Sequence, residues 1–157
     1  MNSLIEGDGQ YLPMANGLRI MALDLLEDAD LKYALPGNPT LGEVFREAGD
    51  IEQSYIDSFK HFKQDFSYHH ADKEVETSIA KLKAWYAQLD AEFDTVLKGL
   101  SEADIASRTI DRGGEFKPSL RDQVMVYTDA VFIIAGKVST YLHALGKANE
   151  QWKAWIG

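Results

Sequence analysis

The chain has 157 residues, no cysteine and a formal net charge of −9 at pH 7. This charge argues against binding to nucleic acid, which needs clustered Lys and Arg, and against binding to an anionic membrane surface. The absence of cysteine excludes disulfides, thiolate metal sites and Cys nucleophiles. No signal peptide is evident, and the longest apolar run, residues 130–135, is too short to span a bilayer. We therefore expect a cytoplasmic protein with one domain over residues 1–157.

Two helices are predicted in the first half of the chain. The first covers residues 13–27 and begins at Pro13, which suits a first helical turn. The second begins after Thr40, where Glu43 completes a capping box. Its apolar residues recur every three or four positions and are Leu41, Val44, Ala48, Ile51, Tyr55, Phe59, Phe62 and Phe66. Gly49 weakens this helix by about 1 kcal/mol relative to Ala, which predicts close packing or a slight bend there.

Two helices are also predicted in the second half. The third begins after Asp72, a suitable N-cap. Its apolar stripe consists of Val75, Ile79, Leu82, Tyr86, Leu89, Phe93, Val96 and Leu100. The fourth begins after Ser119, with Asp122 in capping-box spacing, and stops at Gly146. Its stripe consists of Leu120, Val124, Tyr127, Val131, Ile134, Val138, Tyr141 and Leu145.

A weak internal repeat relates the two halves of the chain. Residues 26–31, LEDADL, are similar to residues 100–105, LSEADI, and a helix that starts at Pro-Thr-Leu or Pro-Ser-Leu follows each of them after a loop. This pattern is typical of a pseudo-symmetric four-helix bundle with connections longer than hairpins. No segment is a good candidate for a strand. The sequence therefore predicts an all-α four-helix bundle with short extra helical turns and a docked C-terminal tail.

The layout resembles the DinB/YfiT-like superfamily of four-helix proteins. The last helix of that family typically reads His-x-x-x-His-Arg-Gly-Gln and then Tyr-Leu-x-x-Leu-Gly. Here the matching stretch reads AVFIIAGK at 130–137 and YLHALG at 141–146. Residues 40–56, TLGEVFREAGDIEQSYI, resemble the family's first ligand-bearing helix. The resemblance covers most of the chain and implies a DinB-like bundle.

In that family three histidines hold a divalent metal, one on the second helix and two a turn apart on the fourth. The matching positions here are Glu47, Ala130 and Ile134. Alanine and isoleucine cannot bind a metal, so the resemblance implies a bundle without the usual metal site. We expect no metal, no cofactor and no catalytic residue. The side chains expected to line the remaining inter-helix cavity are Glu47, Tyr127, Ala130, Ile134 and Lys137.

Glu47 has two interpretations. It is either a boundary carboxylate in water or a carboxylate in the cavity, paired with Lys137, Arg46 or Tyr127. Glu47 also belongs to an acidic series with Glu43 and Asp50, which forms either a solvated face or a site for a hard cation.

The four histidines do not rebuild a metal site in any obvious way. His61 is fourteen residues from Glu47, about 21 Å along a helix at 1.5 Å per residue. His69 and His70 are expected in a solvated loop close to Asp72, and His143 is expected at a helix end.

Three functions remain open. The first is a DinB-like protein without the metal that binds a small molecule in the inter-helix cavity. The alternative is a metal-dependent thiol transferase or hydrolase with an altered, carboxylate-containing site. The third is a structural dimer without a ligand.

A homodimer is expected because the chain has more apolar surface than four helices need. Trp85 and Leu97 lie beside the third stripe, and Trp152, Trp155 and Ile156 follow the last helix. The tail is expected to dock on the bundle or on a second subunit, since large exposed apolar patches are uncommon on monomers.

Overall fold

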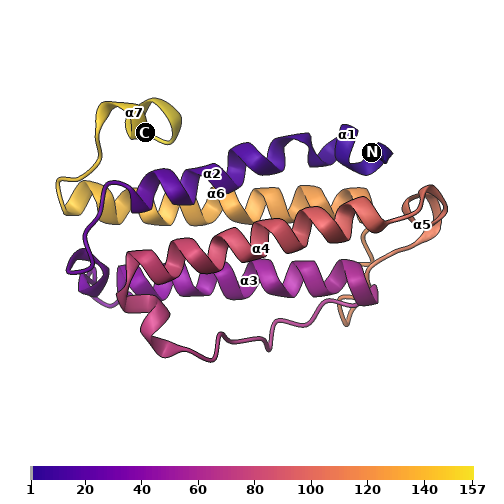
Figure 1. Cartoon of the computed structure of the whole chain (residues 1–157), viewed down its shortest axis with the longest axis horizontal. Coiled ribbons are helices and arrows are strands. Elements are labelled where there is room, and N and C mark those ends of the chain that lie inside the picture. Colours follow the sequence, from indigo (N-terminus) through magenta and orange to yellow (C-terminus); the bar gives the residue numbers. More distant parts are fainter. Residues whose placement is uncertain (1) are drawn as a thin grey trace.

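Four long helices pack side by side in the computed structural model, which describes residues 2–157 (Figure 1). They are α2 (Leu12–Leu23), α3 (Leu41–His61), α4 (Ile79–Gly99) and α6 (Leu120–Ala144). Each contacts two neighbours, since α2 packs on α4 and α6, and α3 packs on the same two helices. The short elements are α1 (Ser3–Glu6), η1 (Asp8–Tyr11), η2 (Asp30–Lys32), η3 (Lys73–Thr77), α5 (Glu102–Ser107) and α7 (Glu150–Trp155). Residues 2–157 contain no strand, only isolated bridges, so the all-α prediction is confirmed.

The connections between the helices follow the internal repeat. Residues 62–72 run back along the length of α3, so that α3 and α4 point in the same direction (Figure 1). In each half an antiparallel bridge precedes the helix start, joining Ala34 to Thr40 in the first half and Thr109 to Ser119 in the second. The buried Leu31 and Ile105 occupy matching places in the two acidic turns. The predicted long connections are therefore present.

Hydrogen bonds explain where α3 and α6 begin. Thr40 and Ser119 each accept a bond from the backbone three residues on, and the side chains of Glu43 and Asp122 complete both capping boxes. Gly146 follows α6 with a φ of 68°, in the left-handed region that glycine tolerates best.

Three predicted helix boundaries are wrong. The first long helix ends at Leu23 instead of residue 27. The second ends at His61, because Phe62 adopts a left-handed conformation with a φ of 54°, and this places Phe66 outside the helix and half in solvent. The third begins at Ile79, since Ser78 caps it, whereas Asp72 caps the separate turn η3.

The close packing predicted at Gly49 is confirmed, and its partner is Trp85. A Cβ atom at Gly49 would lie 2.3 Å from the indole ring of Trp85, so no larger residue fits there without a shift. Trp85 and Leu97 are both buried within the bundle. The second apolar edge that these two residues were expected to form is therefore absent.

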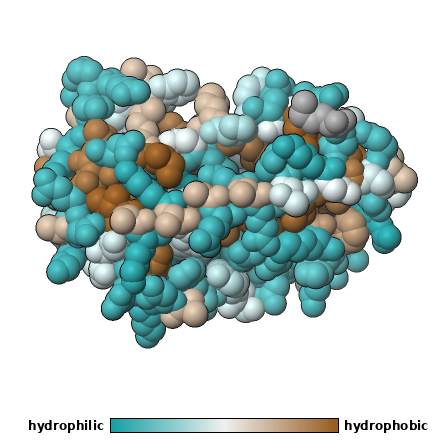
Figure 2. Space-filling view, in the orientation of Figure 1, coloured by the Kyte–Doolittle hydropathy of each residue, from teal (hydrophilic) through white to brown (hydrophobic). Residues whose placement is uncertain are grey.

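The C-terminal tail docks on its own bundle. Trp152 of α7 has no exposed surface, and its Nε1 donates a hydrogen bond of 3.0 Å to Ser139 of α6. Trp155 remains 55% exposed. Figure 2 shows a mainly hydrophilic face with smaller apolar areas between the polar residues. Among the helices of residues 2–157, none combines the length and the hydropathy that crossing a bilayer requires.

Candidate functional site

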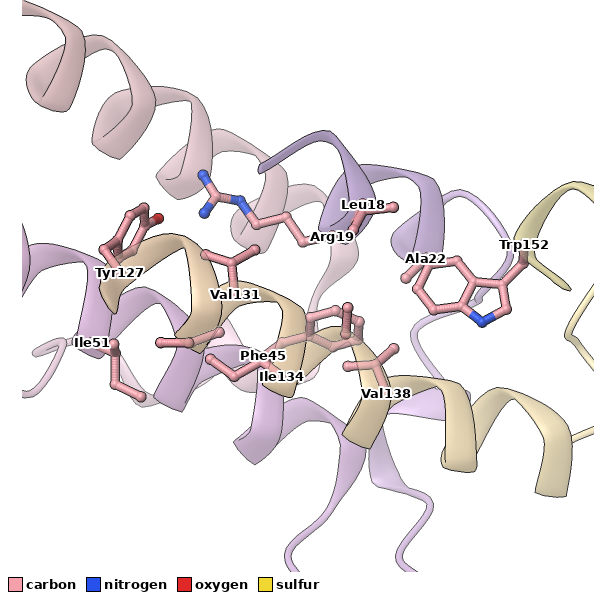
Figure 3. Close-up of a pocket in the computed structure, with 13 residues that line it drawn as sticks. Leu18, Arg19, Ala22, Phe45, Ile51, Tyr127, Val131, Ile134, Val138 and Trp152 are labelled. Carbon is pink, nitrogen blue, oxygen red and sulfur yellow. The ribbon is translucent and has the colours of Figure 1, made fainter. Parts of the chain in front are cut away.

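An apolar hollow lies between α2, α3 and α6, and α7 closes one end of it (Figure 3). Its volume is about 460 Å³ with the open mouth included, and about 30 Å³ of this space admits a water molecule. Its lining consists of Leu18, Arg19, Ala22, Phe45, Ala48, Ile51, Tyr127, Ala130, Val131, Ile134, Ala135, Val138 and Trp152. In Figure 3 Trp152 lies at one end, and Arg19 and Tyr127 lie at the other. The hollow is thus apolar over most of its length and polar at one end.

The hollow contains three of the five residues expected to line a cavity. Tyr127, Ala130 and Ile134 line it, whereas Glu47 and Lys137 line a separate pocket beside Pro39 and Tyr141. Glu47 is exposed, as a boundary carboxylate in water would be. Its suggested partners make other contacts, since Arg46 pairs with Glu76 at 2.8 Å and the hydroxyl of Tyr127 donates to Asn16 at 3.0 Å.

A buried charged cluster lies at the polar end of the hollow and joins α2, α3 and α4. The guanidinium of Arg19 donates to Glu52 through one nitrogen and to Asp90 at 2.7 Å through another. Asn16 donates to the same oxygen of Asp90, also at 2.7 Å, and accepts the bond from Tyr127 of α6. The side chain of Glu52 is fully buried, whereas that of Asp90 is 40% exposed. All four long helices therefore meet in one hydrogen-bonded cluster.

Burial dominates the ionisation of this cluster. Loss of water, opposed by Arg19 and reinforced by Asp90, raises the pKa of Glu52 from 4.5 to about 7. Burial acts to lower the pKa of Arg19, but Glu52, Tyr127 and Asp90 together raise it, so the guanidinium stays charged. Burial also raises the pKa of the Tyr127 phenol.

We expect Glu52 to make stability depend on pH. Between pH 4.5 and 7 the folded chain holds the Glu52 proton that the unfolded chain releases, so the free energy of unfolding falls as pH rises. Over this pH range the fall should amount to a few kcal/mol, at roughly 1.4 kcal/mol per pH unit. Glu52→Gln should remove this fall, which denaturation in urea at pH 5, 6, 7 and 8 would measure. If the free energy of unfolding depends on pH equally in the wild type and the variant, Glu52 is not the cause of this dependence.

One polar atom of the hollow has no partner. Three lining residues carry polar side-chain atoms, and two of them are satisfied, Tyr127 by Asn16 and Trp152 by Ser139. The third is Arg19, whose Nε is buried and has no hydrogen-bond partner within residues 2–157. Buried donors are nearly always paired with protein or water, so this unpaired N–H is an exception among the polar atoms of the lining.

The loop histidines form a strap across α3 and do not face the hollow. The carboxylate of Asp50 accepts a 2.8 Å bond from the backbone of His70 and lies 3.3 Å from Nδ1 of His69. The ring of His70 packs on Trp85 at 4.3 Å between centroids. Within residues 2–157 no three His, Asp or Glu side chains lie close enough to hold a metal ion. The donor set at Glu47, Ala130 and Ile134 does not fit a three-histidine metal site.

The chain matches no protein-family model, no curated protein and no solved structure.

Sequence reasoning missed the charged cluster. A signal was present, because Glu52 is four residues from both Ala48 and Ile56 and so lies on the inward side of its helix. Arg19 likewise stands next to Leu18 and three residues before Ala22. Charged residues on an inward face are seldom buried without a partner.

Proposed function

We propose that this protein is a DinB-like helical bundle without the family's metal, and that it binds a small, mainly apolar molecule in the hollow between α2, α3 and α6. The ligand carries one hydrogen-bond acceptor, which takes the free N–H of Arg19. The observation that carries the proposal is the unpaired, buried Nε of Arg19 beside an otherwise apolar lining. Ligand sites are commonly apolar concavities with few polar groups that fix orientation, and in bundles they lie between helices.

The position and shape of the hollow support this proposal. Ala130 and Ile134 of α6 line the hollow, and they match the positions at which the DinB/YfiT-like superfamily has metal ligands. In this chain both side chains are apolar. Ile51, Ala130 and Ile134 are only partly buried, so the hollow opens to solvent along the α3–α6 edge. A ligand therefore has an entrance along this edge, and one larger than a water molecule must displace lining side chains, because only about 30 Å³ of the hollow admits water.

The test is calorimetric titration with cyclohexanone, a ring ketone with one acceptor. We expect saturable binding that Ala130→Leu abolishes by filling the hollow, whereas Ala144→Leu on the exposed end of α6 leaves it unchanged. Cyclohexanone should bind at least as tightly as methylenecyclohexane, although the ketone is the better hydrated molecule. Equal binding to both alanine variants would overturn the assignment of the site, and preference for the hydrocarbon would overturn the role of Arg19.

We expect no stoichiometric Ni or Zn in the untagged protein. Of the three positions that match the family's ligands, Ala130 and Ile134 have no donor atom and Glu47 lines a different pocket. Elemental analysis by mass spectrometry measures the metal content directly. One equivalent of a tightly bound transition metal would contradict the proposal and favour the metal-dependent enzyme instead.

We also propose that the protein forms a homodimer, because exposed apolar side chains lie on α6. Met125 and Ile133 are 53% and 64% exposed on the outer side of this helix, and Phe132 lies beside them. Light scattering at micromolar concentration should give about twice the chain mass of 17.6 kDa. Ile133→Lys should return the mass to that of one chain. A wild-type mass of one chain would rule out the dimer.

A further inference from the structure

A second concavity lies on another side of the bundle and shares no lining residue with the hollow. This groove runs between α4 on one side and α1, η1 and α2 on the other, and about 390 Å³ of it admits a water molecule, against about 30 Å³ in the hollow. Its apolar walls come from Ile5, Leu12, Ile20, Phe93 and Leu97. A volume above about 300 Å³ is within the range of small-molecule sites.

The lining of the groove includes two acidic side chains, of which Asp90 is also paired with Arg19 behind it at 2.7 Å. Asp90 and Asp94, one helical turn apart on α4, both line it, and none of its lining residues within residues 2–157 is Lys, Arg or His. Asp94 pairs outside the groove with Lys98 at 2.6 Å. An occupant that complements this lining has an apolar body and a cationic group.

Asp90 has one carboxylate oxygen left for such a group. Asn16 and Arg19 both donate to its Oδ1. Its Oδ2 receives no hydrogen bond from residues 2–157. Because the side chain is 40% exposed and lines the groove, Oδ2 is accessible from solvent. The internal bonds of Asp90 thus fix the carboxylate and leave one acceptor open.

Gly17 contributes space to the same groove. It stands in the interior of α2, where glycine is the poorest helix former apart from proline. A Cβ atom at this position would meet nothing within 4 Å, so packing against the bundle does not require a glycine. Gly17 is exposed and lines the groove, so a larger side chain there would have open space to occupy beside the groove.

From the shape, the charge and the open oxygen of Asp90, we infer that the groove binds a small organic cation, a primary amine on an apolar body. The ammonium group donates to Oδ2 of Asp90, and the apolar body lies on Ile5, Pro13 and Ile20, the apolar lining side chains that keep exposed surface. This inference does not rest on the function proposed for the hollow, although Arg19, which lines the hollow, donates to Asp90 of the groove.

Titration with hexylamine, monitored by calorimetry, tests the inference against two matched probes, hexan-1-ol and hexanoate. We expect saturable binding of the amine, at least tenfold weaker binding of the alcohol and none of the anion. Similar affinities for amine and alcohol would overturn the inference, because the groove would then recognise only the apolar body.

Three variants locate the amine. Asp90→Asn should weaken binding at least tenfold, whereas Asp129→Asn, the same charge change on the exposed side of α6, should change it less than twofold. Gly17→Leu leaves the charged cluster intact and should abolish binding by filling the groove, even where Asp90→Asn unfolds. Binding that survives in folded Gly17→Leu, or falls equally in Asp129→Asn, would overturn the inference in favour of general attraction to an acidic chain.

Discussion

Arg19→Met should lower the free energy of unfolding by about 3–5 kcal/mol at pH 8, because removing one partner of a buried ion pair leaves the other charge unpaired. Glu52 has no exposed side-chain surface, and the lost guanidinium is its partner. The loss should be smaller at pH 5.5, since Glu52, whose pKa is about 7 in the wild type, is then protonated with or without Arg19. Denaturation in urea at the two pH values measures both effects.

Two further variants distinguish this explanation from a general effect of losing a cation. Adding Glu52→Gln to Arg19→Met should recover part of the stability at pH 8, because the uncompensated charge is gone. Lys60→Met breaks two ion pairs, with Asp57 and Glu92, whose side chains are 31–40% exposed, and should cost less than about 1 kcal/mol. A similar loss for Arg19→Met and Lys60→Met would show that the cluster has no special role.

Phe93→Ala should cost about 3–5 kcal/mol, the loss of apolar burial plus the cavity left behind. Phe93 is 2% exposed and contacts aromatic rings on two other helices, Phe59 of α3 at 5.7 Å and Tyr127 of α6 at 4.9 Å between centroids. Its truncation therefore affects three helices at once. Chemical denaturation measures the loss.

Phe116→Ala is the matched control, because this ring is 59% exposed. It should change the free energy of unfolding by less than about 1 kcal/mol. A loss below about 1 kcal/mol for Phe93→Ala would contradict the packing of α4 against its neighbours.

Helix periodicity predicts much of this fold because local rules determine it. The capping boxes at Thr40 and Ser119 and the stop at Gly146 depend on residues within one turn, and each was predicted. The end of α3 was not, because Phe62 and Phe66 continue the apolar spacing past the last helical residue. Spacing alone does not show that Phe62 adopts a left-handed conformation.

The candidate site was predicted only in part. Tyr127, Ala130 and Ile134 of α6 were expected to line a cavity because this helix resembles the last helix of the DinB/YfiT-like superfamily. All three line the hollow. The charged cluster depends on which helices become neighbours. Arg19 and Glu52 are 33 residues apart, and Arg19 and Asp90 are 71 apart, so no local pattern pairs them. The same limit applies to Trp85, which lies beside the apolar stripe of its own helix in the sequence. Only the packing of α4 on α3 shows that its ring lies against Gly49.

The most direct measurement of the central claim is a methyl NMR titration of the wild-type protein with cyclohexanone. If the hollow is the ligand site, the methyl signals of Ala22, Ala130 and Val138 should shift together and saturate, because all three residues line it. The methyl signal of Ala144, on the exposed end of α6, should stay in place. Saturating shifts confined to other methyl groups, or none at all, would contradict the proposal that this protein binds a small molecule between α2, α3 and α6.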